Sequence, residues 1–305
     1  IQSESFTLFC LGSYLIGCLL GFGQLYRFAA IEVTPEEHKA RAVSLVLFGG
    51  IFSGILGPGI AFLTKDWVEG APFMGSYQSL IGLYILVFLL LQLVDLPKPT
   101  ASEQQPRTRP FSEIMRQTSW KISVLSAALG YAAMALIMTA TPLSMQAHQH
   151  SFSASAFVIQ WHVIAMFMPS FFTGNLIQRF GGKNIMLMGI GLYLLCILIN
   201  TQGQFFLSYW SALILLGVGW NFMFIAGTTL LTETYRPEEK ALVQGVNDVL
   251  VFGSAASGSL LAGILQNQIG WESLNMVVAP PLLLLAGWLL WRKRNRGILI
   301  QQPIH

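Results

Sequence analysis

The sequence predicts an all-α integral membrane protein, and three observations lead to this class. Hydrophobic residues make up 54% of the chain and charged residues only 10%, whereas soluble domains carry about a quarter charged residues. Apolar runs long enough to cross a bilayer as helices recur along the whole chain. Almost all lysine and arginine residues fall in alternate connections between these runs, which is the asymmetry of a protein inserted in a membrane.

A transmembrane helix needs about 18 to 25 mostly apolar residues, and nine runs meet this requirement. We expect these helices near residues 6–26, 44–64, 77–94, 122–143, 154–177, 184–200, 207–231, 241–265 and 273–291. The connections after the first, third, fifth, seventh and ninth runs hold every lysine and arginine except Lys65. The positive-inside rule therefore predicts a cytoplasmic C-terminus and an external residue 1. The net charge of +3 is an orientation signal, and no nucleic-acid partner is expected.

One long hydrophilic connection, residues 95–121, divides the chain. It is rich in Pro, Gln and Arg and exceeds ordinary loop length, with three spans before it and six after it. The three cysteines lie inside apolar runs, where cysteine behaves as a small hydrophobic residue. They show no disulfide or metal spacing, so no cofactor and no metal are expected.

Two segments on either side of this connection repeat each other. Residues 35–54 and 237–258 both begin with Pro-Glu-Glu and both end in Phe-Gly-x-x-x-Ser-Gly, so that Gly54 corresponds to Gly258. Six predicted spans separate the two copies. Repetition at this distance predicts two helical bundles in the same orientation.

Two motifs add a family resemblance. Residues 174–183, Gly-Asn-Leu-Ile-Gln-Arg-Phe-Gly-Gly-Lys, resemble the motif G-x-L-x-D-R-x-G-R/K, with Gln178 in place of its Asp. Gly54-x-x-Gly57-Pro58 resembles the Gly-Pro motif in helix five of drug:proton antiporters. On these motifs and the repeat, essentially the whole chain resembles the major facilitator superfamily (MFS) of secondary transporters, near its bacterial drug-antiporter members. The first span lacks the Arg of the family's helix-four motif.

The resemblance implies the MFS fold, in which twelve helices form two six-helix halves. The nine spans then correspond to helices 4–12, and we expect roughly 90 further residues forming three spans in the natural protein. The expected domains are residues 1–95 as the remainder of the N-terminal bundle, 96–121 as a cytoplasmic linker and 122–305 as the C-terminal bundle. A monomer in the bacterial inner membrane is expected.

Small residues form one face of the second span and recur in the eighth. At 3.6 residues per turn, Gly50, Gly54 and Pro58 share one stripe, with Gly57 on the next. Close backbone approach through small residues holds membrane helices together, and the resemblance implies the fifth span as partner of the second. Helix packing without a transport role is the alternative. The expected interface and gating residues are Gly50, Gly54, Gly57, Pro58, Ser170, Gly174, Gly253, Ser257 and Gly258.

A short basic turn follows the fifth span. Arg179, Gly181 and Lys183 belong to the loop motif described above. Glycines permit the reversal, and cations near a helix C-terminus interact favourably with the helix dipole. A phosphate-binding loop would need a preceding strand, which the sequence does not predict.

Asp248 is the one acidic residue that we place inside a span. Even on a lenient scale, a charge at bilayer depth costs about 2.5–3.5 kcal/mol, so such a residue needs an explanation. It either binds the coupling proton or a cationic substrate, or it forms an ion pair or helix cap near the cytoplasmic gate. The sequence leaves both open.

Other polar and aromatic residues within the spans are candidates for binding a substrate. Asn221, flanked by aromatic residues, suits a pocket for a flat or amphipathic solute, although a single interhelical hydrogen bond is the alternative. His162 either changes charge near neutral pH or is a neutral packing residue. The substrate contacts predicted in this way are Tyr131, Met134, Gln160, His162, Trp220 and Asn221.

The resemblance implies transport by alternating access around a central site. Proton-coupled export of a drug-like compound or metabolite is the function expected first, with uptake of a small metabolite or vitamin as the alternative. A membrane sensor without transport activity is a third possibility. An enzyme would need clustered catalytic residues, which we do not find in the sequence. The expected partners are a small-molecule substrate, the lipid bilayer and protons.

Overall fold

The protein is helical throughout the part of the chain that the structure describes. The computed structural model describes residues 5–71, 73–93 and 109–300, and their side chains except Pro58, Phe62 and residues 293–300. Within these ranges there are helices and turns and no β-strand. The predicted linker, residues 96–121, and the cations Lys98 and Arg107 therefore lie partly or wholly outside the described residues.

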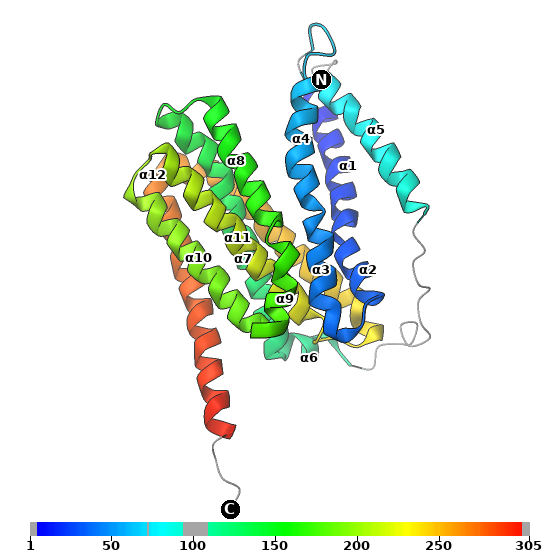
Figure 1. Ribbon diagram of the computed structural model, residues 1–305, viewed down its shortest axis with the longest axis vertical. Helices are drawn as coiled ribbons and strands as arrows, with labels where there is room; N and C mark the ends of the chain where they lie inside the picture. The colour runs from blue at the N-terminus through cyan, green and yellow to red at the C-terminus, as the bar shows by residue number, and fades with distance from the viewer. Residues whose placement is uncertain (1–4, 72, 94–108, 301–305) are drawn as a thin grey trace, which may run out of the picture.

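Twelve α-helices and two short 3₁₀ helices make up the described chain (Figure 1). In order they are α1 (Phe6–Gln24), α2 (Tyr26–Glu32), η1 (Glu36–His38), α3 (Lys39–Phe48), α4 (Gly50–Thr64), α5 (Met74–Leu91), α6 (Phe111–Arg116), α7 (Thr118–Ala147), α8 (Phe152–Phe167), α9 (Ser170–Phe180), α10 (Gly182–Gln202), α11 (Phe206–Leu231), η2 (Pro237–Glu239) and α12 (Lys240–Ile300).

Seven helical stretches in the described residues are long and apolar enough to cross a membrane, or eight if the bent pair α8–α9 is one span. The pair α8–α9 is not among the seven, and its two helices are bent by 42° relative to each other. The 56-residue stretch Pro237–Arg292 counts as one, but α12 breaks at Gly270, where φ is 77° and ψ is 175°. Glycine adopts this conformation without a steric penalty. A count of nine requires both the bent pair and a division at Gly270, and it stays a prediction.

The first span continues beyond its expected end at residue 26. The stretch Phe6–Glu32 is apolar enough to be one span, and α2 buries Arg27, Phe28 and Ile31. Arg27 is therefore buried in a helix, and its expected position towards the cytoplasmic side stays a prediction, whereas the expected end of the span before it is wrong. The reason is that burial against other helices extends a span past the point where its hydropathy falls.

The helices form two groups that meet at one end. In Figure 1, α1 to α5 lie on one side and α7 to α12 on the other, and the groups converge near α2, α3 and α9. We call the end at which α2, α3, α9 and the start of α12 meet the closed end. The core lies in the second group, where α11 carries the largest share of buried residues.

Close backbone contact joins the groups at the closed end. A Cβ atom on Gly174 of α9 would lie 2.7 Å from the Cα atom of Arg41 in α3. Since backbone cannot move aside as a side chain can, this position requires glycine. This contact uses the predicted Gly174, but its partner Arg41 precedes the second predicted span. The second and fifth predicted spans meet next to it, where the ring centres of Phe48 and Phe171 lie 5.7 Å apart.

Polar contacts between the groups also lie at the closed end. Lys240 Nζ pairs with Glu32 Oε1 at 2.8 Å, and Gln178 Nε2 donates a hydrogen bond to the backbone oxygen of Glu37. An Asp at position 178, as in the family motif, could not donate this bond. Lys65 follows α4 at the opposite end of the molecule (Figure 1).

Candidate functional site

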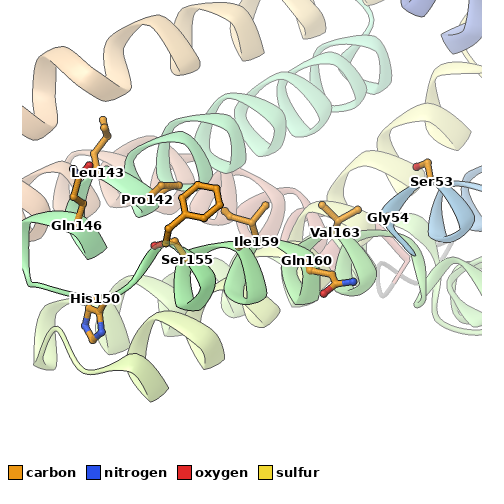
Figure 2. Close-up of a pocket in the computed structure, with 12 residues that line it drawn as sticks. Ser53, Gly54, Pro142, Leu143, Gln146, His150, Ser155, Ile159, Gln160 and Val163 are labelled. Carbon is orange, nitrogen blue, oxygen red and sulfur yellow. The ribbon is translucent and has the colours of Figure 1, made fainter. Parts of the chain in front are cut away.

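A cavity of about 680 Å³ lies between α4 of the first group and α7 and α8 of the second. This volume is in the range of small-molecule sites in proteins. Figure 2 shows its lining side chains on turns of these three helices and of the α7–α8 connection. They are Ser53, Gly54, Pro142, Leu143, Gln146, His150, Phe152, Ser155, Ala156, Ile159, Gln160 and Val163.

The deep end of the cavity is closed by α4 against α8. A Cβ atom on Gly54 would lie 2.6 Å from Val163 Cγ1, and one on Gly50, a turn deeper, would lie 2.6 Å from the Phe167 ring. Gly57 differs, because no described atom that could block a Cβ lies within 4 Å of it. The expected close contact at Gly57 is therefore wrong for this structure, and Pro58 lies outside the described side chains.

Aromatic rings of the second group fill the space next to Phe167. Phe167 lies 5.8 Å from Trp220, and Trp220 stacks on Phe224 at 4.9 Å with 11° between the ring planes. Tyr131 presents its edge to Trp220, Phe224 and Phe252 at 5.3, 5.6 and 5.4 Å. These five rings, from α7, α8, α11 and α12, are called the aromatic layer.

Arg27 of the first group lies against this layer. Its Cζ atom is 5.0 Å from the centre of the Phe224 ring and 5.7 Å from that of Phe252, which are cation–π distances. Its own neighbour Phe28 lies at 4.6 Å on the same side of the interface. The side chain is only 1% exposed. The aromatic layer is therefore in contact with both groups of helices.

The guanidinium of Arg27 pairs with the carboxylate of Asp248 on α12. Its Nη1 also donates to Gln24 Oε1 at 3.0 Å, and Asn247 Nδ2 donates to Asp248 Oδ1 at 3.0 Å. Asp248 is thus not an isolated carboxylate, and of the two alternatives left open by the sequence the structure contains the ion pair. With the Lys240–Glu32 pair, α2 and α12 are joined by two ion pairs.

Three of the six predicted substrate contacts lie at this site. Gln160 lines the cavity, and Tyr131 and Trp220 belong to the aromatic layer. The other three are enclosed by the second group, and they are Met134, His162 and Asn221.

Asn221 is held by other helices of the second group. Its Nδ2 donates to the backbone oxygen of Met166 at 2.7 Å and to Ser170 Oγ at 2.5 Å, and its Oδ1 accepts from Thr173 Oγ1 at 2.7 Å. The residue is completely buried. This geometry favours the interhelical hydrogen bond over direct contact with a solute.

His162 also points into the second group. Its Nδ1 lies 2.8 Å from the backbone oxygen of Leu213, and the residue is completely buried. No solvent reaches the ring, which favours the packing role for this histidine.

Replacing Asn221 with Leu is expected to destabilise the protein more than it weakens binding of a solute. The change removes the Asn221 partner of the Met166 backbone oxygen and of Ser170 Oγ, whereas Thr173 Oγ1 keeps its hydrogen bond to the Pro169 oxygen. Each buried unpaired group costs about 1–3 kcal/mol. Thermal unfolding of the purified protein in detergent measures the effect, with the exposed Asn267→Leu as a control. Loss of affinity at unchanged stability would restore the role of Asn221 in the substrate pocket.

The predicted turn between α9 and α10 lies at the closed end. Gly181 has φ 82° and ψ 144°, a conformation that favours glycine. The Cζ atom of Arg179 lies 5.2 Å from the centre of the Phe180 ring, and Lys183 is in the first turn of α10. The motif thus forms the sharp reversal between α9 and α10.

The small residues of the eighth predicted span have separate roles. A Cβ atom on Gly258 would lie 2.5 Å from the backbone oxygen of Ala132, so this glycine packs α12 against α7. Gly253 and Ser257 are exposed in the described structure, and no described atom that could block a Cβ lies within 4 Å of Gly253. Of the three, only Gly258 makes the predicted close contact.

Several residues of the site were not among the sequence candidates. The sequence did not predict four residues that lie in or next to apolar runs, namely Arg27, Phe167, Phe224 and Phe252. For Arg27 the sequence does indicate a place inside a helix, because the apolar residues after it continue that helix to Glu32. For the phenylalanines no signal distinguishes a ring at the site from one facing lipid.

In the described part of the predicted linker, Arg109 is bound to the second group. Arg109 Nε and Nη2 donate to the Glu239 carboxylate at 2.5 and 2.7 Å, and Nη2 also donates to the backbone oxygen of Thr234 at 3.0 Å. The hydrogen bond to Glu239 raises the pKa of Arg109 above its ordinary value. This contact fixes the start of α6 and α7 relative to η2.

Comparison with known proteins shows similarity over nearly the whole chain. The family model described as Major Facilitator Superfamily matches residues 3–247 and, in a second match, residues 123–298. Riboflavin transporter RfnT of Brucella anthropi is 39% identical over 299 residues, which cover 97% of this chain and 75% of the relative. An uncharacterized MFS-type transporter of Bacillus subtilis, YdeG, is 28% identical over 289 residues, or 88% of this chain and 66% of that protein.

A solved structure shares the fold. The crystal structure of the fucose:proton symporter FucP of E. coli superimposes with a TM-score of 0.64 at 17% identity, covering 94% of this chain and 78% of that one. The chain thus spans about two thirds to four fifths of the length of these three proteins.

Proposed function

Because the chain belongs to the major facilitator superfamily, whose members are transporters rather than enzymes, we propose that it takes up a flat aromatic vitamin of the riboflavin type. It is a multi-pass membrane protein with a cavity between two groups of helices. The observation that carries the proposal is the aromatic layer next to the deep end of the cavity: Phe167 follows the cavity-lining Val163 by one turn of α8 and contacts Trp220, and rings of this kind suit the faces of a flat solute. The 39% identity with a riboflavin transporter supports the same substrate class.

The proposed path runs from the cavity towards the closed end. The solute enters the cavity, reaches the aromatic layer at Phe167 and Trp220, and leaves once the closed end has opened. With the basic turns facing the cytoplasm, as the positive-inside rule predicts, this path is uptake through the bacterial inner membrane. Asp248 and its partner Arg27 lie between the layer and the closed end, so the ion pair separates the solute from the cytoplasm.

Proton-coupled export of a drug-like compound, the function that the sequence suggests first, is the second candidate. The Gly54-x-x-Gly57-Pro58 motif on α4 favours it, since the motif resembles that of drug:proton antiporters. Asp248 remains its proposed proton-binding residue. Vitamin uptake takes precedence here because the relative at 39% identity is a vitamin transporter.

Uptake of labelled riboflavin tests the proposal. The full gene product is expressed in a bacterium that can neither make nor import riboflavin, and uptake is compared with that of cells carrying an empty vector. We expect saturable uptake that unlabelled lumichrome, which keeps the ring system, inhibits and that ribitol, which keeps only the side chain, does not. Loss of uptake after an uncoupler is added would indicate that uptake is coupled to protons. No uptake, together with lower ethidium accumulation than in vector cells, would favour export.

A further inference from the structure

Two buried N–H groups of the site have no hydrogen-bond partner in the described part of the chain. They are Nε of Arg27 and Nε1 of Trp220, and the two residues are 1% and 2% exposed. Burial without a partner removes an N–H group from water with no compensation, which costs free energy. Both side chains contact Phe224. The centre of the Phe224 ring lies 5.0 Å from the Cζ atom of Arg27 and 4.9 Å from the centre of the Trp220 ring.

The ion pair does not account for all donors of Arg27. Nη2 pairs with Asp248 and Nη1 donates to Gln24, whereas Nε has no hydrogen-bond partner among the described residues. A lysine could supply charge for an ion pair, but it would not supply the planar fork of an arginine. This donor is therefore available to a partner outside the described residues.

The two donors lie on opposite sides of the interface between the helix groups. Arg27 comes from α2 in the first group, and Trp220 and Phe224 come from α11 in the second. When the groups move apart in alternating access, the guanidinium separates from the rings. The space so formed is bounded on one side by aromatic faces, on which a flat ring can stack, and on the other by the N–H groups of the guanidinium, which can reach the edge of that ring.

We propose that Arg27 and Trp220 determine specificity by donating hydrogen bonds to acceptor atoms on the edge of a flat fused-ring solute. The faces of the solute stack in the aromatic layer, while ring carbonyl oxygens or ring nitrogens accept from Arg27 Nε and Trp220 Nε1. This inference rests on the proposed transport of a flat aromatic solute. It adds that a ring system without acceptors is rejected, because it would leave both donors unpaired.

A ratio of two affinities tests this role. The probes are lumiflavin, a three-ring solute with two ring carbonyls, and anthracene, three fused rings with no acceptor atom, both measured by equilibrium binding to the purified protein in nanodiscs. We expect the wild type to prefer lumiflavin about 100-fold, or about tenfold for each hydrogen bond. Arg27→Lys, which keeps the charge for Asp248, and Trp220→Phe, which keeps the stacking, should each lower the preference to about tenfold.

The ratio separates a specificity role from a structural one. General damage to the site weakens both probes alike and leaves their ratio unchanged. Trp210→Phe is the matched control, because Trp210 is on the same helix, its Nε1 also has no described partner, and it lies about 15 Å away along the helix. This variant should keep the wild-type preference.

Each result decides between the claims. If the wild type binds lumiflavin and both variants keep its full preference, the inference is overturned while the proposed function stands. If the wild type binds neither probe nor riboflavin, the proposed function itself fails. Because the two variants remove different donors, a folding defect in one leaves the other as a test.

Discussion

Asp248→Asn is expected to abolish both gradient-driven accumulation of the solute and its exchange without a gradient. The variant keeps the shape of the side chain but leaves the guanidinium of Arg27, which is 1% exposed, without its anionic partner. An uncompensated buried charge costs about 3–5 kcal/mol. Since the pair joins α2 to α12 across the closed end, this loss lowers the population with that end shut by more than about 100-fold.

Proteoliposomes measure both activities on the same preparation. Asp66→Asn is the control, because Asp66 is exposed at the opposite end of the molecule and should leave both activities intact. The exchanged pair, Arg27→Asp with Asp248→Arg, should recover part of the exchange that either single change abolishes. If Asp248→Asn loses accumulation but keeps exchange, Asp248 is the proton-binding residue that the sequence suggested.

Gly54→Leu should cut transport by at least about tenfold while the protein still inserts in the membrane. A Cβ atom at Gly54 would already lie 2.6 Å from Val163 Cγ1, and valine is a stiff side chain with little freedom to move aside. Leucine therefore separates α4 from α8 and fills the deep end of the cavity. Both effects oppose transport, because close approach of small residues holds these helices together.

Gly57→Leu is the matched control on the same helix. The added side chain meets no described atom within 4 Å at its Cβ position, so we expect this variant to keep most of its transport. Uptake is normalised to the amount of protein in the membrane for both variants. An equal loss of transport in the two variants would mean that the clash with Val163 does not cause the loss. Full transport by both would mean that transport does not need the close approach of α4 to α8.

The membrane class and the family could be predicted from the sequence. Low charge, long apolar runs and the motif at residues 174–183 lead to an all-α MFS transporter, and the family match and the shared fold confirm this prediction. Sequence alone is enough for these two predictions, because they depend on composition and on short stretches of chain. The orientation in the membrane and the domain boundaries stay predictions.

The limits of helices were less predictable. Hydropathy placed the end of the first span before Arg27, but α2 continues to Glu32 because Arg27 is covered by rings and paired with Asp248. Likewise, α7 begins at Thr118, inside the predicted linker. In both cases tertiary contacts extend a helix into residues whose own hydropathy would end it.

The site was predicted in part. Tyr131, Gln160 and Trp220 were chosen because they are polar or aromatic within a span, and they lie at the cavity or the aromatic layer. Asn221 met the same criterion but faces α8 and α9. A helix that is apolar all round gives no periodicity from which to tell its inward face, so residue type alone could not separate neighbours such as Trp220 and Asn221.

The pairing of Arg27 with Asp248 also affects how the chain enters the membrane. The two residues are 221 positions apart, and ribosomes add about 5–20 residues per second, so Arg27 emerges roughly 10–45 s before its partner. During this interval a guanidinium near the end of an inserted helix must reach the headgroup region along its flexible stem. Assembly of the closed end is therefore a late step of biogenesis, and chains that stop before Asp248 lack the anionic partner that Arg27 has in the complete fold.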